Sequence, residues 1–211
     1  MHSGPSERIR RALQHARFGI WTIALTYGLS VFAGLLMVHS GNRYALDFRD
    51  KLVGKARRES VILRQFHRGN SVAAAGMDAA GNAVAGLLSM VAGYCVPAGY
   101  GVAAYRGWIG GVVSVNAAHR SRLARPFGAF YYLVTLLLQL VPYSLTGGAG
   151  VNMGIAAFAS ESRTAYQGPR MPLLRIPYEA IRDAGWVYMI SLPLFAVASV
   201  FEFMMQKIAR S

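Results

Sequence analysis

The feature that most constrains this chain is a series of uncharged apolar runs as long as a bilayer is thick. The first runs from Phe18 to Val38 and reads FGIWTIALTYGLSVFAGLLMV. A helix needs about 20 apolar residues to span the hydrocarbon core, where the backbone must satisfy its own hydrogen bonds in helices or closed barrels. Barrel strands alternate polar and apolar residues over about ten positions, and these runs do not. The sequence therefore predicts an all-α, polytopic helical membrane protein.

Composition indicates the same class. Hydrophobic residues make up 54% of the 211 residues and charged residues only 15%, against roughly a quarter in ordinary globular chains. The basic N-terminus before the first run resembles a signal peptide. However, the run is too long for a typical signal sequence and no A-x-A cleavage site precedes the next basic stretch. We expect an uncleaved first helix and a single membrane domain over residues 1–211.

We predict about five membrane segments, with the central ones short or broken. The expected segments are a first helix at 18–38, a second at 71–105, a short or re-entrant piece at 107–118, a broken helix at 127–159 and a last helix at 184–205. The expected structural breaks are glycines and a proline, namely Gly107, Gly110, Pro142, Gly147, Gly148 and Gly150. Breaks at membrane depth are tolerated where protein or water covers the freed backbone, and they are a sequence pointer to membrane binding sites.

Residues 41–70 form a polar segment with eight Lys or Arg and three Asp or Glu. Apolar residues recur in it at helical intervals, namely Leu46, Val53, Ala56, Leu63 and Phe66. This pattern predicts an amphipathic helix on the membrane surface or against a partner. A solvated helix that contacts nothing is the alternative. The net charge of +13 is expected to meet anionic lipid head groups rather than nucleic acid, because no soluble face interleaves basic and aromatic residues. The distribution of Lys and Arg mildly favours an external N-terminus.

Polar residues within or beside the apolar runs are the candidate functional residues: Asp78, Asn82, Arg106, Asn152 and Glu202. Ionisable groups at membrane depth are costly, face the protein interior and mark functional sites. The alternative for the two carboxylates is an interfacial position where they reach water or pair with an arginine. Arg106 either pairs with Asp78 or Glu202 or snorkels to the interface, and Asn152 is a candidate interhelical hydrogen-bond donor.

No catalytic motif accompanies these residues. The sequence contains no G-x-S-x-G, H-E-x-x-H, P-loop or nucleotide-binding glycine fingerprint. The five histidines are scattered through polar segments, and Cys95 is the only cysteine. We therefore expect a protein that is not an enzyme, with no metal site and no cofactor.

The order of the segments carries a family resemblance. A basic start, a first helix and a polar segment lead to a Gly-rich helix and the element Arg106-Gly107-Trp108-Ile109-Gly110. A leucine-rich helix then meets Pro142 and continues as Gly147-Gly148-Ala149-Gly150, and the closing helix contains Val200-Phe201-Glu202-Phe203. From about Phe18 to Phe203 the chain resembles the stage II sporulation protein M family of integral membrane proteins. Many members carry His-Gly and then a Glu after the proline, where this chain has Tyr143-Ser144, so roles attached to that cluster are not carried over.

The resemblance implies a non-enzymatic subunit that scaffolds or anchors a multiprotein membrane complex. Its partners would be other membrane or periplasmic (extracytoplasmic) proteins, and a homo-oligomer is a further possibility. The alternative is a transporter or permease subunit of an export system, which the broken segments and Glu202 favour. Both functions place a multi-pass protein in a bacterial inner (plasma) membrane.

Overall fold

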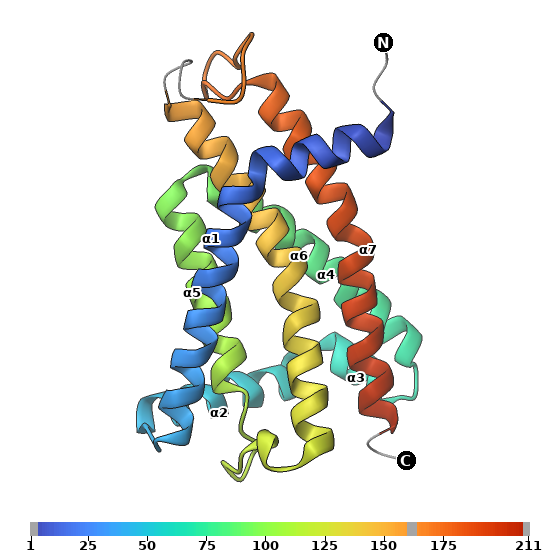
Figure 1. Ribbon diagram of the computed structural model, residues 1–211. Helices are drawn as coiled ribbons and strands as arrows, with labels where there is room; N and C mark the ends of the chain where they lie inside the picture. Colours follow the sequence, from blue (N-terminus) through green and yellow to red (C-terminus); the bar gives the residue numbers. More distant parts are fainter. Residues whose placement is uncertain (1–3, 160–163, 209–211) are drawn as a thin grey trace.

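The computed structural model describes residues 4–159 and 164–208, with side chains up to Met204. Within these residues the chain is all-helical, as predicted. The elements are α1 (Pro5–His39), α2 (Arg43–Glu59), α3 (Val61–His67), α4 (Ser71–Tyr94), α5 (Val96–Val112), the short 3-10 helix η1 (Arg122–Ala124), α6 (Pro126–Phe158) and α7 (Tyr178–Ile208) (Figure 1).

Four helices are long and apolar enough to cross a membrane: α1, α4, α6 and the Tyr178–Met204 part of α7. Their outward faces are apolar rather than charged. On α1, the side chains of Trp21, Leu25 and Leu29 follow one another at intervals of about one turn, and they are 75%, 62% and 60% exposed. A soluble monomer rarely exposes such a continuous apolar stripe, whereas lipid covers it without cost. The pattern is that of a membrane protein.

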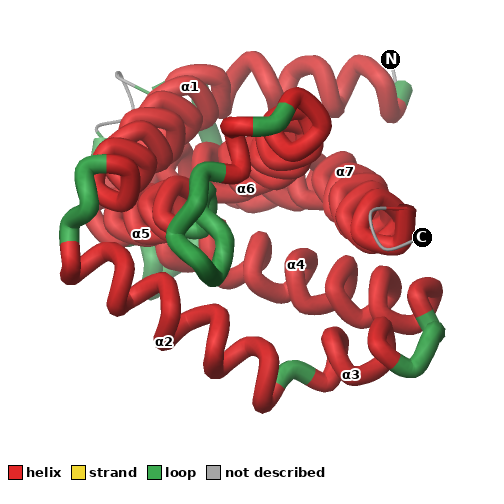
Figure 2. The backbone as a smooth tube through the Cα atoms, turned by 90° about the horizontal axis from the view of Figure 1, so that it is seen from below, coloured by secondary structure: helices red, strands yellow, loops and turns green. Residues whose placement is uncertain are grey.

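The long helices run along one axis and the polar segment lies across one end of them. Figure 1 shows α1, α5, α6 and α7 roughly upright, α4 crossing obliquely behind them, and α2 and α3 across the lower end. The two termini lie at opposite ends of the bundle. Seen from below, α2 and α3 follow one another along one edge (Figure 2). We call α2 and α3 together the platform.

Side-chain caps and left-handed glycines set the ends of the platform helices. Asn42 and Ser60 accept hydrogen bonds from backbone N–H groups in the first turns of α2 and α3, and Asn70 does the same for α4. Each such cap satisfies an orphan donor at a helix start. Gly41 and Gly69 have φ of +75° and +84°, a conformation that glycine adopts without strain, so the chain can turn sharply before α2 and α4. The segment expected as one amphipathic helix thus folds as two.

The break predicted at Gly107 is not there, because α5 is continuous from Val96 to Val112. A Cβ on Gly107 would overlap the carbonyl oxygen of Tyr27 on α1. Gly107 therefore lets two helix backbones approach closely, as small residues do in membrane helices. Gly110 does not break α5 either, and a Cβ there would meet the side chain of Leu136 on α6 at 3.2 Å. A glycine at a helix contact and a glycine at a helix break look alike in the sequence.

The chain turns instead at Cys95, so the predicted helix at 71–105 is two helices. Pro97 lies in the first turn of α5, where its missing N–H has no helical partner to lose. The predicted piece at 107–118 is not a re-entrant segment, since it consists of the end of α5 and the loop before η1.

Pro142 does not break its helix either, because α6 is continuous from Pro126 to Phe158. Neighbouring helices and hydroxyl side chains allow proline within a membrane helix, and Thr146 Oγ1 donates to the Pro142 carbonyl at 3.0 Å. The following glycines are contact points too. Cβ atoms on Gly148 and Gly150 would overlap the backbones of α1 and α4, respectively, and Gly147 lies against Ile23 of α1.

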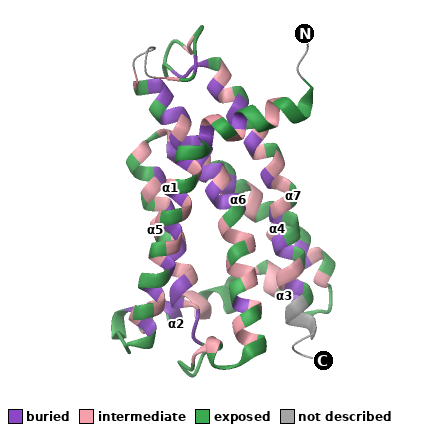
Figure 3. Ribbon diagram, viewed as in Figure 1, coloured by how far each residue is buried: buried purple, intermediate pink, exposed green. Residues whose placement is uncertain are grey.

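The core occupies one half of the bundle. Between Pro126 and Val141 only Tyr132 of α6 is buried, whereas most residues from Pro142 to Ala157 are buried. Figure 3 shows the same division, with buried residues concentrated in the upper half. The upper half is therefore closely packed, and the half next to the platform is more open.

Candidate functional site

A polar network lies between α4 and α7. Asn82 Nδ2 donates to Asp78 Oδ2 at 2.9 Å, one helical turn away. Ser199 Oγ of α7, which is fully buried, donates to the same carboxylate oxygen at 2.7 Å. Such hydrogen bonds join helices where lipid supplies no hydrophobic drive for association. The carboxylate predicted at Asp78 is thus held by two donors from two helices.

The network continues to α5 and α6 through an aromatic ring. Tyr143 Oη donates to Asn82 Oδ1 at 2.7 Å, and the Arg106 guanidinium carbon lies 3.8 Å above the centroid of the Tyr143 ring. A cation over an aromatic face is favourable by up to about 2 kcal/mol when desolvated. Among the described residues Arg106 forms no ion pair with Asp78 or Glu202. Four helices therefore share one buried polar path.

The centre of the bundle beside this network is nearly closed. A cavity of only about 10 Å³ lies next to Arg106 and Tyr143, lined also by Ile23 and Ser89. A single water needs roughly 10–15 Å³. The polar path at this depth can therefore hold one water at most and no larger solute.

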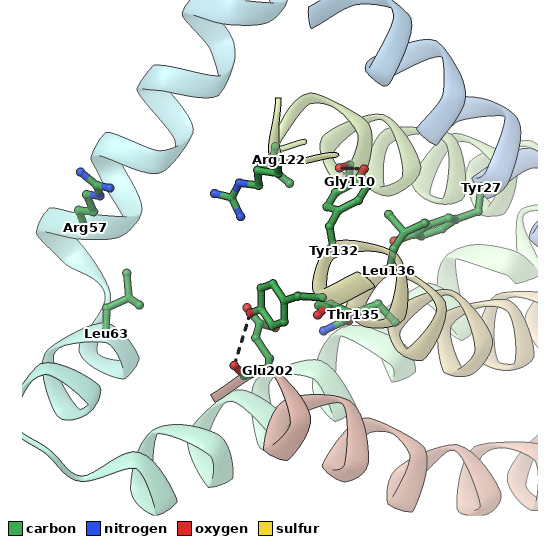
Figure 4. Close-up of a pocket in the computed structure, with 12 residues that line it drawn as sticks. Tyr27, Arg57, Leu63, Gly110, Arg122, Tyr132, Thr135, Leu136 and Glu202 are labelled. Atoms are coloured by element: carbon green, nitrogen blue, oxygen red, sulfur yellow. Dashed lines mark hydrogen bonds between the residues drawn. The ribbon is translucent and has the colours of Figure 1, made fainter. Parts of the chain in front are cut away.

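A larger pocket of about 520 Å³ lies between the platform and the lower half of α6. Its lining comes from α1, α2, α3, α5, η1, α6 and α7 and comprises Tyr27, Arg57, Leu63, Gly110, Val113, Arg122, Tyr131, Tyr132, Thr135, Leu136, Gln139 and Glu202. Figure 4 shows Arg57 and Leu63 on the platform side, with the Arg122 guanidinium extending into the space between them and Tyr132. The pocket lies within the range of roughly 300–1,000 Å³ typical of ligand sites.

Charges of both signs line this pocket without neutralising one another directly. No ion pair joins Arg122 to Glu202 within 4.0 Å, and the guanidinium groups of Arg57 and Arg122 have no hydrogen-bond or ion-pair partner in the described part of the chain. The surrounding protein lowers the pKa of Arg122 by desolvation, and Glu202 is among the groups that oppose this shift. An arginine stays protonated despite such shifts. The pocket therefore presents two cations and the carboxyl group of Glu202.

The tyrosines of the pocket offer rings rather than free hydroxyls. Tyr132 Oη donates to the Gly110 carbonyl at 2.9 Å, and Tyr131 Oη donates to the Glu202 carbonyl at 3.4 Å. These bonds tie α6 to α5 and to α7. The two rings line the pocket together with Leu63, Val113 and Leu136, and the Tyr131 ring also stacks on that of Phe201, with the centroids 6.2 Å apart.

A series of polar side-chain contacts attaches the platform to the loop before η1. Arg49 Nη1 donates to Asp50 Oδ1 at 2.7 Å, and His119 Nε2 lies 2.8 Å from Asp50 Oδ2. The hydrogen bond from Arg49, followed by that from His119, holds the pKa of Asp50 below its ordinary value. A ring contact of 4.7 Å between Phe48 and Trp108 adds an apolar link to α5.

Asn152 belongs to a separate cluster at the opposite end. Its Nδ2 donates to Tyr166 Oη at 2.7 Å, and the Tyr166 ring packs edge-on against His15 at 5.1 Å. His15 Nδ1 lies 2.8 Å from Asp183 Oδ2. Burial raises the pKa of the Tyr166 phenol. Tyr166 lies in the loop between α6 and α7, so Asn152 donates to a loop residue and not to another helix. Through His15 and Asp183 the cluster links this loop to α1 and α7.

The structure thus brings Asp78, Asn82 and Arg106 into one network, places Glu202 in the adjacent pocket and leaves Asn152 apart. Sequence reasoning missed Ser199 and Tyr143, which connect the network, and Arg122, which faces Glu202. A serine in an apolar helix and one arginine among several in a basic loop carry no distinguishing signal.

Residues 4–159 and 164–204 contain no group of three or more His, Cys, Asp or Glu side chains that could hold a metal ion. Comparison with protein-family models, curated proteins and solved structures finds no match to this chain. Its function is therefore inferred from the geometry and from the resemblance of the sequence.

Proposed function

We propose that this chain is a multi-pass integral protein of a bacterial inner membrane in which five helices cross the bilayer. The fifth is α5, whose 17 residues extend about 25 Å at 1.5 Å per residue, near the lower limit for a span. An odd number of crossings fits the position of the termini at opposite ends of the bundle (Figure 1).

The basic residues favour a cytoplasmic platform and an external N-terminus. The platform end carries eight Lys or Arg in residues 41–70 and three more in residues 113–125. Cytoplasmic loops are enriched in such residues. Cys95 is exposed and is the single residue between α4 and α5, which meet on the side of the bundle away from the platform (Figure 1). A membrane-impermeant maleimide added to intact cells should label Cys95. The same reagent should not label a cysteine introduced by Lys51→Cys in a protein that also carries Cys95→Ala. The reverse labelling pattern would show that the orientation is the opposite one.

Within the membrane we propose a non-enzymatic subunit that anchors a multiprotein complex. The observation that carries this choice is the closed centre, where the cavity beside Arg106 measures about 10 Å³. A solute carrier would need a binding site near the midplane, and this space is too small for one. The basic, exposed face of the platform supplies a surface for acidic partners, and the sequence resemblance implies the same role.

Purification in mild detergent tests this role. We expect stoichiometric partner proteins to accompany the chain, and Lys51→Glu with Lys55→Glu to release them by reversing charge on the platform. Arg10→Glu with Arg11→Glu makes the same charge change at the other end and should keep the partners. A monodisperse protein without partners would contradict an anchoring role.

A permease subunit is the second candidate, and the open pocket with Arg122 and Glu202 is the observation that favours it. Here the pocket would be one end of a pathway completed by another subunit. A flux of solute into proteoliposomes that is lower for the Glu202→Gln variant than for the unchanged protein would support the permease role. Normal complex assembly without flux of any tested solute would leave the anchoring role in place.

A further inference from the structure

We propose that the pocket between the platform and α6 binds one phospholipid through a zwitterionic head group that carries a phosphate and an ammonium, as phosphatidylethanolamine does. The inference rests on the proposed membrane placement, which puts the platform at the head-group level. It does not depend on the role of the protein in a complex.

The phosphate is assigned to the two arginines. Arg57 and Arg122 line the same pocket from the platform and from η1, and in the described residues their guanidinium groups have no protein partner. Guanidinium forms short, often bidentate hydrogen bonds with phosphate. Their positions on two separate elements (Figure 4) would let one phosphate bridge the platform to the bundle.

The ammonium is assigned to Glu202 and the tyrosine rings. The Glu202 side chain lines the pocket together with Tyr131 and Tyr132, whose hydroxyls are already hydrogen-bonded. A carboxylate attracts an ammonium, and aromatic faces bind cations. A head group with phosphate alone would instead bring an anion toward Glu202, and like charges in a poorly solvated site repel. Discrimination by such repulsion is a usual source of specificity.

The apolar part of the lining is assigned to the start of the acyl chains. Leu63, Val113 and Leu136 lie beside the charged groups, as an amphiphile at the interface requires. A pocket of about 520 Å³ takes a head group and the first methylenes, and the rest of the chains extends into the bilayer.

Native mass spectrometry of the purified full chain in detergent tests the proposal, with phosphatidylethanolamine, phosphatidylglycerol and inorganic phosphate as separate probes. We expect one bound phosphatidylethanolamine per chain, held about tenfold more tightly than phosphatidylglycerol, which is the effect of one favourable charged contact, and no retained inorganic phosphate. Arg57→Gln and Arg122→Gln should each weaken binding of phosphatidylethanolamine by about tenfold. Glu202→Gln should abolish the preference over phosphatidylglycerol.

The matched controls are Arg58→Gln on the platform and Arg120→Gln in the loop, which remove the same charge outside this pocket. Both should leave the affinity unchanged. Arg57 is at the surface of α2, so its variant should fold even if Arg122→Gln does not. Equal binding of the two lipids, equal losses in control and pocket variants, or retention of inorganic phosphate would each overturn the proposal. Labelling of Cys95 from the cytoplasmic side would instead contradict the membrane placement on which it rests.

Discussion

A methyl group added at Gly93 tests whether the glycines of this chain are contact points between helices. Gly93 lies on α4, and a Cβ there would be 2.7 Å from the Val151 nitrogen and 2.8 Å from the Gly150 Cα on α6. Ordinary contacts between such atoms are about 3.5–4.0 Å, so α4 and α6 would have to separate by roughly 1 Å. Both neighbours are backbone atoms and cannot rotate away.

Overpacking of this kind usually costs about 1–3 kcal/mol, and the higher helix propensity of alanine returns up to about 1 kcal/mol. We expect Gly93→Ala to lower the free energy of unfolding by about 1–2 kcal/mol, measured by circular dichroism during titration with SDS in mixed micelles. Gly81→Ala, in the same helix but with no atom within 4 Å of its Cβ position, should be neutral or stabilising. Equal shifts in the two variants would refute the reasoning.

Further predictions concern buried hydroxyls and the platform contact. Ser199→Ala should lower the free energy of unfolding by about 1–3 kcal/mol, because the fully buried Ser199 hydroxyl donates to the half-buried carboxylate of Asp78. Ser144→Ala should leave it unchanged or higher, because the buried Ser144 hydroxyl has no hydrogen-bond partner among the described residues. The pKa of Asp50 is lowered in the folded state, so its contribution is present above the ordinary carboxyl pKa and is lost as the pH falls through the folded value. The protection factors of the amides in residues 113–121, which are exchange rates corrected for the intrinsic effect of pH, should fall between about pH 5 and about pH 2. Asp50→Asn should remove this fall, and an unchanged profile in the variant would contradict the prediction.

The helical class could be predicted because the length of an apolar run is a local property. The same holds for Asp78 and Asn82, since a spacing of four puts them on one helix face. The partners of these residues could not be predicted, because Tyr143 and Ser199 come from helices far away in the sequence and meet Asn82 and Asp78 only through packing.

The predicted breaks were wrong for a related reason. Gly107 and Pro142 are helix breakers in isolation, but their neighbours decide their role: Gly107 faces the backbone of α1, and Pro142 is buried within a continuous α6. The chain turns at Cys95, where no glycine is present. The sequence feature that indicates this turn is Pro97, two residues later, because proline is common in the first turn of a helix.

In the proposed arrangement with five crossings, the one-residue connection between α4 and α5 has a consequence for biogenesis. Arg106 makes α5 expensive to insert alone, by about 2.5–3.5 kcal/mol for an arginine at the centre of a helix, and α5 has only 17 residues over which to recover that cost. With Cys95 as the sole link, α5 cannot leave the translocon as an independent segment after α4 has settled. We therefore expect the two helices to enter the bilayer together as a hairpin, with Arg106 reaching the ring of Tyr143 only when α6 arrives.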